Sequence, residues 1–345
     1  MRKTVLFAAL TLMACSAFSQ DLADLFEQNK HSVVTIYVSE SMNTGTGDPR
    51  TFTSNQGLGS GILIKDDLVL TASHVVANAD KIMVQFYDGE SVEATTTRIS
   101  RMADVAVITL SSPPANPKVA LFGNSDDVRI GDEIFVVGAP MGLPYSLSRG
   151  VISGRHAEHE LSNDGKSLEF FQTDAAINTG NSGGPMFNYN GEVIGIVSSI
   201  LTRSGGFEGI GFAATSNVAR ELLTNRGSRY FGIESLVLSN EMASILNVPQ
   251  ESGLLVQHVV RNSPAGMLGI KGGFRKVTIG EEEILLGGDI ILQVDHIVIT
   301  GEESNYKLWE YLNSGQSTVT YTIKVLRAGK IKEFRWVSSE FHPTQ

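Results

Sequence analysis

The sequence predicts a mainly β fold: an all-β sandwich or barrel unit, followed by a smaller mixed α+β module. In the first part of the chain, short runs rich in valine and isoleucine alternate with clusters of glycine, proline, asparagine and aspartate. This is the pattern of many short strands joined by turns. From residue 229 onward, short strands mix with helical periodicity. At 345 residues the chain also exceeds the size at which single cores stop growing, so two domains are expected.

The elements of the first unit follow from local patterns. Leu22, Leu25 and Phe26 have helical spacing, which predicts a short helix over residues 21–30. The expected strands span residues 33–38, 61–64, 68–70, 82–86, 105–110, 134–137, 193–197 and 210–213. Residues 41–56 are polar and rich in Gly, Thr and Asn, so a mobile loop is expected there. A helix over 216–224 closes the unit, and residues 225–228 form a linker.

The second unit is expected to be an α+β module of about a hundred residues. Its strands are expected over 254–260, 290–294 and 319–326, and its helices over 241–246 and 304–312. Ser304 is the expected N-cap of the second helix.

The N-terminus has the features of an export signal. Arg2 and Lys3 precede an apolar run over residues 4–14, which is too short to span a bilayer, and small residues follow. Residues 1–19 are therefore expected to be a signal peptide, with Gln20 as the new terminus. The chain's single cysteine, Cys15, loosely resembles the cysteine of a bacterial lipoprotein box, and membrane association is expected only if it is lipidated. Without it the exported protein has no disulfide, which favours a bacterial envelope.

The charge excludes one class of partner. A formal net charge of −10, spread without long runs, argues against nucleic acid binding. With 42% hydrophobic and 19% charged residues, the composition is that of an ordinary folded protein.

Three residues suggest catalytic chemistry. Ser182 lies in Gly-Asn-Ser-Gly-Gly-Pro at 180–185, which is either a glycine-rich turn or a loop that exposes a hydroxyl beside converging N–H groups. His74 follows an apolar strand, where an imidazole can act as a general base, although a lone histidine is more often structural. Asp104 opens another apolar strand, as a turn residue or as the partner of an imidazole N–H. The order His, Asp, Ser is that of chymotrypsin-type enzymes, and the three signals together are far stronger than each alone.

The chain resembles the HtrA/Deg family of envelope serine proteases over nearly all its length after the signal peptide. The matching stretches are Gly-Ser-Gly-Ile at 59–62, Thr-Ala-Ser-His-Val-Val at 71–76, Ala-Asp-Val-Ala-Val at 103–107, Gln-Thr-Asp-Ala-Ala-Ile-Asn at 172–178, Gly-Glu-Val-Ile-Gly-Ile at 191–196 and Gly-Ile-Gly-Phe-Ala at 209–213. The resemblance implies a chymotrypsin-like double β-barrel protease domain over 20–225, followed by an α+β PDZ domain over 229–340.

The catalytic roles follow from protonation and from the resemblance. Ser182 is expected to be the nucleophile and His74 its base, with Asp104 holding the imidazole tautomer. The oxyanion hole is expected at Gly180, Asn181 and Ser182, with the N–H groups of Gly180 and Ser182 as donors.

The resemblance also places a substrate pocket and a regulatory loop. Ala176 is expected to form the floor of the S1 pocket and Ile200 and Leu201 to line it, which favours small aliphatic side chains at P1. Arg155 lies in the segment through which family members sense PDZ occupancy, and it is expected to help order the 180–182 loop. The cluster of His156, His159 and acidic residues after Arg155 is taken as a solvated loop and not as a metal site.

Tyr230, Phe231, Gly232 and Ile233 resemble the carboxylate-binding loop of family PDZ domains. In such loops consecutive N–H groups hold a C-terminal carboxylate while the peptide adds a strand to the sheet edge. The alternative is that these residues merely begin a strand. Leu308 is the expected pocket residue of the 304–312 helix. Residues 271–286 are an insertion relative to shorter bacterial PDZ domains, and their role does not follow from the sequence.

The leading functional hypothesis is an ATP-independent serine endopeptidase that degrades unfolded or misfolded envelope proteins. It needs no cofactor and no metal. Its partners are unfolded polypeptides and C-terminal peptides, and the family implies a homotrimer or a higher oligomer. Two alternatives stay open. One is a regulatory protease with a dedicated membrane substrate, and the other is a peptide-binding chaperone with little proteolysis.

Overall fold

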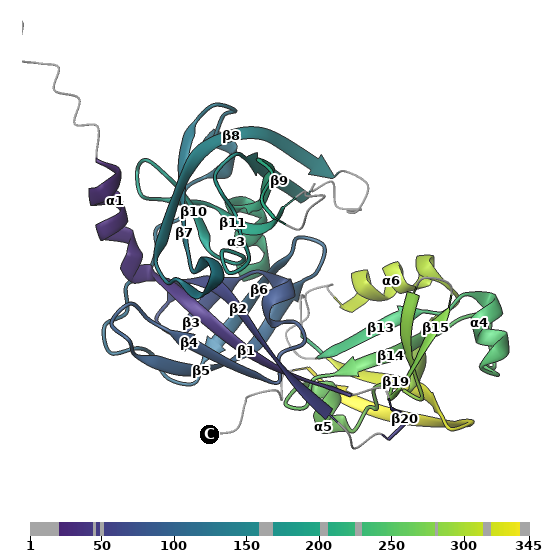
Figure 1. The fold of residues 1–345 in the computed structure, drawn as a ribbon. Helices are drawn as coiled ribbons and strands as arrows, with labels where there is room; N and C mark the ends of the chain where they lie inside the picture. The colour runs from purple at the N-terminus through teal and green to yellow at the C-terminus, as the bar shows by residue number, and fades with distance from the viewer. Residues whose placement is uncertain are drawn as a thin grey trace, which may run out of the picture.

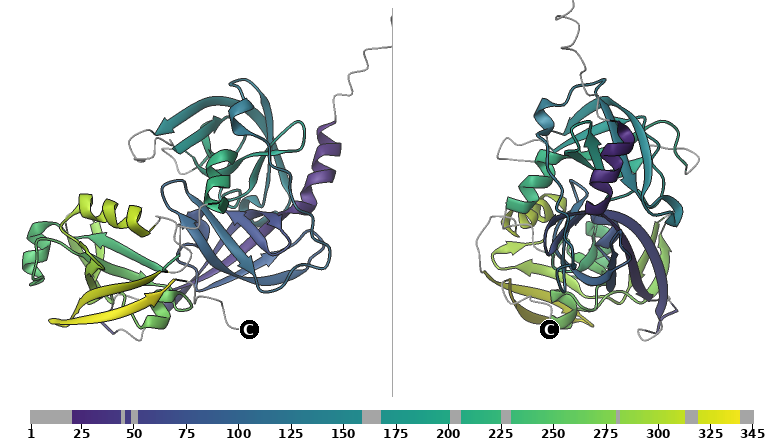
Figure 2. Two further views of the ribbon diagram at one scale, coloured as in Figure 1. Left: turned by 180° about the vertical axis from the view of Figure 1, so that it is seen from behind. Right: turned by 90° about the vertical axis from the view of Figure 1, so that its left-hand side faces the viewer.

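The computed structural model describes residues 21–43, 46–48, 52–158, 168–200, 206–224, 230–279, 282–312 and 319–338. Within these ranges two β-barrels adjoin each other, and a smaller domain lies beside the first barrel (Figure 1; Figure 2). The expected signal peptide, with Cys15, and the expected linker lie outside the described residues. Among the helices that are described, none is long and apolar enough to cross a membrane.

The first barrel is closed and antiparallel, with strand order β1-β2-β3-β6-β5-β4. Its strands are β1 (Val33–Asn43), β2 (Phe52–Lys65), β3 (Leu68–Thr71), β4 (Lys81–Gln85), β5 (Ser91–Ser100) and β6 (Val105–Leu110). Alternate side chains point inward, so that Val34, Ile36 and Leu63 are almost fully buried in one cluster. Closure pairs both edges of the sheet, which removes exposed edge strands.

The second barrel repeats this architecture with strand order β10-β11-β12-β9-β8-β7. Its strands are β7 (Glu133–Gly138), β8 (Ser146–Glu158), β9 (Leu168–Thr173), β10 (Pro185–Asn188), β11 (Val193–Ile200) and β12 (Gly211–Thr215). Ile134, Ile152 and Phe171 are fully buried in its core. Two closed six-stranded barrels confirm the mainly β, chymotrypsin-like architecture expected from the sequence.

A separate apolar cluster joins the two barrels. Ile62 and Leu70 of the first barrel share it with Phe135 and Phe187 of the second, whose rings stack with centroids 5.0 Å apart. Helices α1 (Leu22–Asn29) and α3 (Ser216–Thr224) flank the barrels, and α1 inserts Leu25, which is completely buried. Burial of one such leucine contributes about 1.5–3 kcal/mol, so this seam holds the barrels in a fixed relation.

The smaller domain contains an antiparallel sheet with path β13-β14-β17-β19-β20, and β18 pairs with β17. Its strands are β13 (Ile233–Val237), β14 (Leu254–Val259), β17 (Ile290–Val294), β18 (Ile297–Val298), β19 (Thr320–Arg327) and β20 (Lys330–Val337), and its helices are α4 (Asn240–Ile245), α5 (Pro264–Leu268) and α6 (Glu302–Leu312). The insertion noted in the sequence forms a separate hairpin of β15 (Arg275–Ile279) and β16 (Glu282–Leu286).

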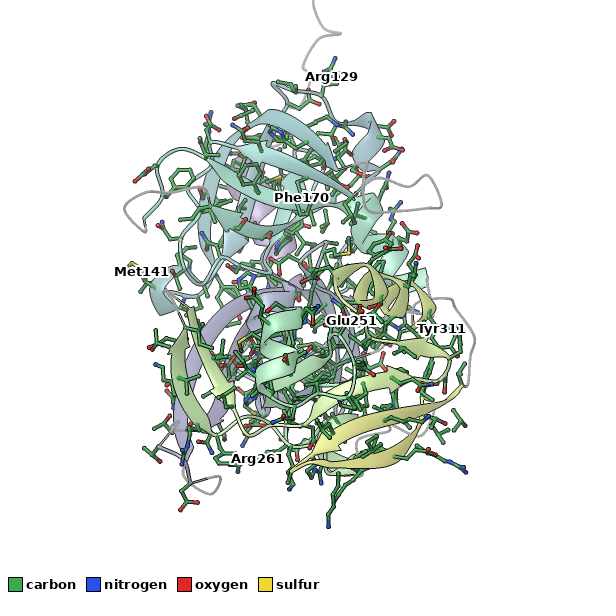
Figure 3. All side chains as sticks on the ribbon, turned by 90° about the vertical axis from the view of Figure 1, so that its right-hand side faces the viewer. Arg129, Met141, Phe170, Glu251, Arg261 and Tyr311 are labelled. Atoms are coloured by element: carbon green, nitrogen blue, oxygen red, sulfur yellow. The ribbon has the colours of Figure 1, made fainter. Side chains whose placement is uncertain are left out.

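The domain meets the first barrel at the segment that follows β3. Asp80 accepts a hydrogen bond from the N–H of Arg261 at 2.7 Å, and Figure 3 labels Arg261 on the small domain. The β15–β16 hairpin adds a second contact, because the N–H of Gly47 donates to the carbonyl of Phe274 at 3.1 Å. Between these contacts lies a cavity of about 1400 Å³ whose lining includes Glu40 and His258.

Three expectations about elements were wrong. Residues 41–43 and 52–56 are not a loop, because β1 and β2 continue as a ladder in which Ser41 pairs with Ser54. Four barrel strands, β5, β8, β9 and β10, were missed. In β5 the inward residues, Val92, Ala94 and Thr96, make only a weak apolar alternation. Ser304 is not an N-cap, because α6 begins at Glu302. The hydroxyl of Ser304 instead accepts from the N–H groups at 300 and 301.

Candidate active site

The sheet brings His74 and Asp104 together. His74 lies on α2 (Ser73–Val76), a single helical turn directly after β3, and Asp104 directly precedes β6. Strands β3 and β6 are antiparallel neighbours with Thr71 opposite Ala106, so the end of one lies beside the start of the other. Asp104 has φ of 50°, in the left-handed region that aspartate tolerates better than most residues.

The Asp104 carboxylate uses both oxygens to hold His74. Its Oδ2 lies 2.8 Å from the imidazole Nδ1, and its Oδ1 accepts the backbone N–H of His74 at 3.0 Å. That N–H has no partner within the short helix, so the carboxylate also caps α2. The hydroxyl of Ser198 donates to Oδ2 at 2.5 Å. This arrangement fixes the ring orientation and favours the tautomer with hydrogen on Nδ1.

The pKa of Asp104 is lowered although its side chain is only 19% exposed. Burial by itself would raise this pKa. The hydrogen bond and charge of His74, helped by the Ser198 hydroxyl, outweigh that effect. Asp104 is therefore held as a carboxylate, which is the form that stabilises an imidazolium.

Ser182 lies on the loop before β10, at the seam between the barrels. Its hydroxyl donates to the carbonyl of Ser198 at 3.3 Å, and among the described residues no hydrogen bond joins it to His74. The N–H groups of Gly180 and Ser182 donate to no other described residue. Gly180 has φ of 103°, and a Cβ there would lie 2.1 Å from the carbonyl oxygen of Ala139, so only glycine fits. The loop thus presents a hydroxyl and two N–H groups without a partner among the described residues, and their role as an oxyanion hole stays a prediction.

The expected S1 residues are placed only in part. Ala176 is exposed, and its carbonyl accepts a hydrogen bond from the Asn181 amide at 3.4 Å. Ile200 ends β11, is half-buried and packs on the core of the second barrel. Leu201 lies outside the described residues. The preference for small aliphatic P1 side chains stays a prediction.

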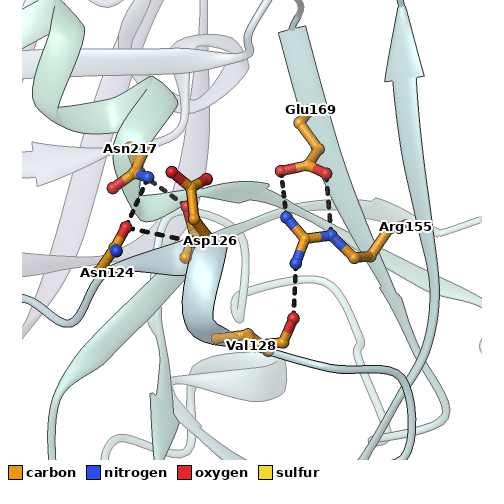
Figure 4. Close-up of polar contacts among 7 residues, drawn as sticks. Asn124, Asp126, Val128, Arg155, Glu169 and Asn217 are labelled. Carbon is orange, nitrogen blue, oxygen red and sulfur yellow. Dashed lines mark hydrogen bonds and ion pairs between the residues drawn. The ribbon is translucent and has the colours of Figure 1, made fainter.

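Arg155 lies on β8 and not in a loop. Its guanidinium forms two hydrogen bonds to Glu169 on β9, at 2.9 and 2.8 Å, and donates to the carbonyl of Val128 (Figure 4). None of these partners belongs to the 180–182 loop, so ordering of that loop by Arg155 would require a rearrangement and stays a prediction. The prediction of a loop at His156 is also wrong, because His156 is part of β8 and its Nε2 lies 2.9 Å from the side-chain oxygen of Gln172. His159 lies outside the described residues. Within the described ranges no cluster of side chains suits a metal ion.

Tyr230, Phe231 and Gly232 directly precede β13, and Ile233 is the first residue of that strand. Gly232 has φ of 83°, and the N–H groups of Phe231 and Gly232 donate to no other described residue. Tyr230 is buried, and its hydroxyl donates to the carbonyl of Ala77 at 2.7 Å, only three residues after His74. Leu308 of α6 is buried in the domain core, and its role as a pocket residue stays a prediction.

Two serines near the candidate triad were not singled out in the sequence. Ser198 contacts both Asp104 and Ser182, and Ser60 contacts the 180–182 loop from β2. Ser60 lies in the Gly-Ser-Gly-Ile stretch that matches the family pattern, which was the available signal. Ser198 carries no such signal, because a serine within an apolar strand has no distinctive neighbours.

Comparison with known proteins shows which family of domains the chain resembles. A family model described as a trypsin-like peptidase domain matches residues 59–196. The chain is 36% identical over 242 residues to a probable periplasmic serine endoprotease DegP-like of Pseudomonas fulva, covering 68% of this chain and 50% of that protein. A protein of the same description from Halomonas elongata is 34% identical over 282 residues, covering 80% of this chain and 55% of the relative. The chain thus spans about half the length of these curated relatives.

Solved structures of similar fold cover most of the chain. The HtrA-type protease AlgW with a decapeptide has a TM-score of 0.52 and 27% identity, covering 91% of this chain and 97% of that one. The same protease with a tripeptide has a TM-score of 0.52 and 28% identity, covering 91% and 96%. The similarity therefore includes the small domain as well as the two barrels.

Proposed function

The chain belongs to the HtrA/Deg family of serine endopeptidases, and we propose that it hydrolyses peptide bonds of unfolded or misfolded polypeptides in the bacterial periplasm, with Ser182 as nucleophile. The observation that carries the proposal is the Asp104 carboxylate, which uses both oxygens to orient His74 beside the Ser182 loop. The relatives named above are described as periplasmic serine endoproteases, which supports both the activity and the compartment.

The mechanism follows from the positions of the protons. His74, with hydrogen on Nδ1, takes the Ser182 proton on Nε2 as the hydroxyl attacks the carbonyl carbon. Asp104 stabilises the imidazolium that forms. The N–H groups of Gly180 and Ser182 receive the oxyanion, and the imidazolium then protonates the leaving amine as the C–N bond breaks. Water, deprotonated by His74, then cleaves the acyl ester, which releases the acid product and restores the Ser182 hydroxyl. Because the Ser182 hydroxyl here donates to Ser198, it must turn toward His74 for attack, and such catalytic hydrogen bonds often form only when substrate is bound.

We assign the small domain a peptide-binding role of the PDZ type. The N–H groups of Phe231 and Gly232, which have no partner in the described part of the chain, suit a carboxylate. Strand β13 lies at the end of the sheet order, where a peptide strand can be added. The AlgW structures contain a decapeptide and a tripeptide, which supports peptides as ligands of this chain as well.

Contacts between the domains connect this segment to the active site. Tyr230 binds the carbonyl of Ala77 next to α2, and Arg101, three residues before Asp104, donates to the carbonyl of Ile233 at 3.2 Å. Peptide binding at Tyr230–Ile233 therefore acts on the two turns that carry His74 and Asp104. Regulation through these contacts requires no movement of Arg155.

The test is cleavage of a chemically unfolded protein by wild type, Ser182→Ala and the exposed control Ser111→Ala. Cleavage by wild type and the control, with none by Ser182→Ala, supports the proposal. Equal cleavage by Ser182→Ala contradicts it. Protection of the unfolded protein from aggregation by all three, without cleavage by any, indicates a chaperone instead.

A further inference from the structure

Ser60 occupies a distinctive position on β2, on the side of the first barrel that faces the Ser182 loop. It is completely buried, and its hydroxyl donates to the carbonyl of Gly180 at 2.6 Å. The same hydroxyl accepts the N–H of Ala139 at 2.9 Å, and the N–H of Ser60 donates to the carbonyl of Ser182 at 2.8 Å. One residue of the first barrel is thus bonded at three points to loops of the second.

These bonds determine which way the peptide groups of the loop face. The carbonyl of Thr179 accepts the N–H of Met141 at 2.8 Å, and the carbonyl of Asn181 accepts the N–H of Gly184 at 2.9 Å. The carbonyl of Gly180, between them, is held by the Ser60 hydroxyl. All three consecutive carbonyls are therefore held by hydrogen bonds, and the N–H groups of Gly180 and Ser182 have no partner among the described residues.

Of the three donors that hold these carbonyls, only the Ser60 hydroxyl belongs to a side chain. The donors to the carbonyls of Thr179 and Asn181 are backbone N–H groups. The Gly180 carbonyl shares its peptide plane with the N–H of Asn181, which donates to the carbonyl of Asn178 at 2.9 Å. The N–H groups of Gly180 and Ser182 belong to the planes on either side, so a shift of this linking plane would turn both oxyanion donors. A hydroxyl has one proton to donate and lone pairs to accept, so serine satisfies Gly180 and Ala139 at once, which alanine cannot do.

We infer that Ser60 is a positioning residue for the oxyanion hole: its hydroxyl bridges Gly180 and Ala139 and thereby holds the N–H groups of Gly180 and Ser182 toward the reacting carbonyl. This inference rests on the proposed function. Ser60 does not touch the substrate, and it acts through the orientation of the loop. Its contribution therefore appears in binding of the tetrahedral species and not in binding of the ground-state peptide.

The test is Ser60→Ala, with Thr71→Val as matched control. Thr71 is equally buried and donates to the Ser60 carbonyl at 2.7 Å, so its variant loses a neighbouring hydrogen bond without releasing Gly180. Three quantities are measured: kcat and KM on a fluorogenic peptide, and the inhibition constant of a peptide aldehyde, whose adduct with Ser182 places an oxyanion in the hole.

Removal of one hole donor in a serine protease lowers kcat by about 100- to 1000-fold, and loss of its support is expected to cost roughly 10- to 100-fold. We expect that loss in kcat for Ser60→Ala, a parallel loss in aldehyde affinity, and a KM that changes little. Thr71→Val is expected to lower the melting temperature without weakening the aldehyde selectively. If Ser60→Ala does not fold, Ser60→Cys, whose thiol is a weaker donor, should show the same two losses to a smaller extent.

The outcomes distinguish a failure of the positioning role of Ser60 from a failure of the proposed function. If Ser182→Ala is inactive but Ser60→Ala, or the folded Ser60→Cys, keeps wild-type kcat and aldehyde affinity, the positioning role is wrong and the proposed function stands. If kcat and aldehyde affinity fall equally in Thr71→Val, the effect is general destabilisation and the positioning role is again wrong. If Ser182→Ala cleaves like wild type, both fall together.

Discussion

Replacement of Asp104 by asparagine keeps the shape of the side chain but changes what it can bind. The carboxylate accepts from the backbone N–H of His74, its ring Nδ1 and the Ser198 hydroxyl. An amide has one accepting oxygen. If that oxygen stays on the His74 N–H, its NH₂ group faces Nδ1 and forces the tautomer with hydrogen on Nε2. That tautomer cannot take the proton of Ser182.

The corresponding change in another serine protease lowers kcat about 10⁴-fold, and we expect a loss of that order here. Stability should change far less, because charge-assisted hydrogen bonds of about 1.5–3 kcal/mol are replaced by neutral ones of about 0.5–1.5 kcal/mol. The lowered pKa of Asp104 sets the sign with pH. Its contribution to stability is present above the ordinary pKa of about 4 and is lost as pH falls through the lower folded value, and the asparagine variant lacks this step.

The assay is kcat on a fluorogenic peptide together with thermal unfolding at neutral and acid pH. Asp132→Asn serves as control, since Asp132 is a surface carboxylate paired with Arg129. A variant at position 104 that retains more than a tenth of wild-type kcat would refute the assignment of Asp104 as the group that orients the base.

Three further variants test other parts of the molecule. Tyr230→Phe removes the hydrogen bond from the tyrosine hydroxyl and leaves the Ala77 carbonyl unpaired. We therefore expect faster amide exchange over residues 73–80 and altered basal cleavage. Unchanged exchange would contradict coupling through this contact. Arg327→Leu leaves Asp289, which is completely buried, without its cation and should destabilise the small domain by about 3–5 kcal/mol, measured as a lower melting transition that spares the barrels. Burial raises the pKa of Glu40 despite the opposing charge of His258, so its ionisation destabilises the fold as pH rises through the ordinary glutamate range. Glu40→Gln should therefore raise the melting temperature at pH 7 but not at pH 4, and the exposed Glu93→Gln should do neither.

The sequence predicted the barrels where strands carry valine and isoleucine, and it placed α3 and β17 at their observed bounds. It missed β8, β9 and β10, it failed at β5, where threonine and alanine point inward, and it failed at the extended arms of β1 and β2. There the ladder is held by backbone hydrogen bonds that no side-chain pattern reports. It also failed at the start of α6, because Ser304 turns back on the preceding chain instead of capping the helix.

At the candidate site, His74, Asp104 and Ser182 could be picked out because each stands at a strand end within a local motif. Ser60 and Ser198 could not, because their roles depend on pairing across strands that are distant in the chain. Ser60 reaches Gly180 across 120 residues, and Ser198 reaches Asp104 across 94. Such contacts are determined by closure and docking of the barrels, which only the folded structure displays.

The central claim is that Ser182 is a nucleophile activated by His74. The most direct measurement is labelling with a fluorophosphonate probe, with and without a C-terminal peptide, followed by mass spectrometry of the proteolysed chain. We predict a single phosphonylated residue, Ser182, whose labelling disappears in His74→Ala while the fold is retained. Labelling at another serine, or equal labelling of Ser182 in His74→Ala, would contradict the account.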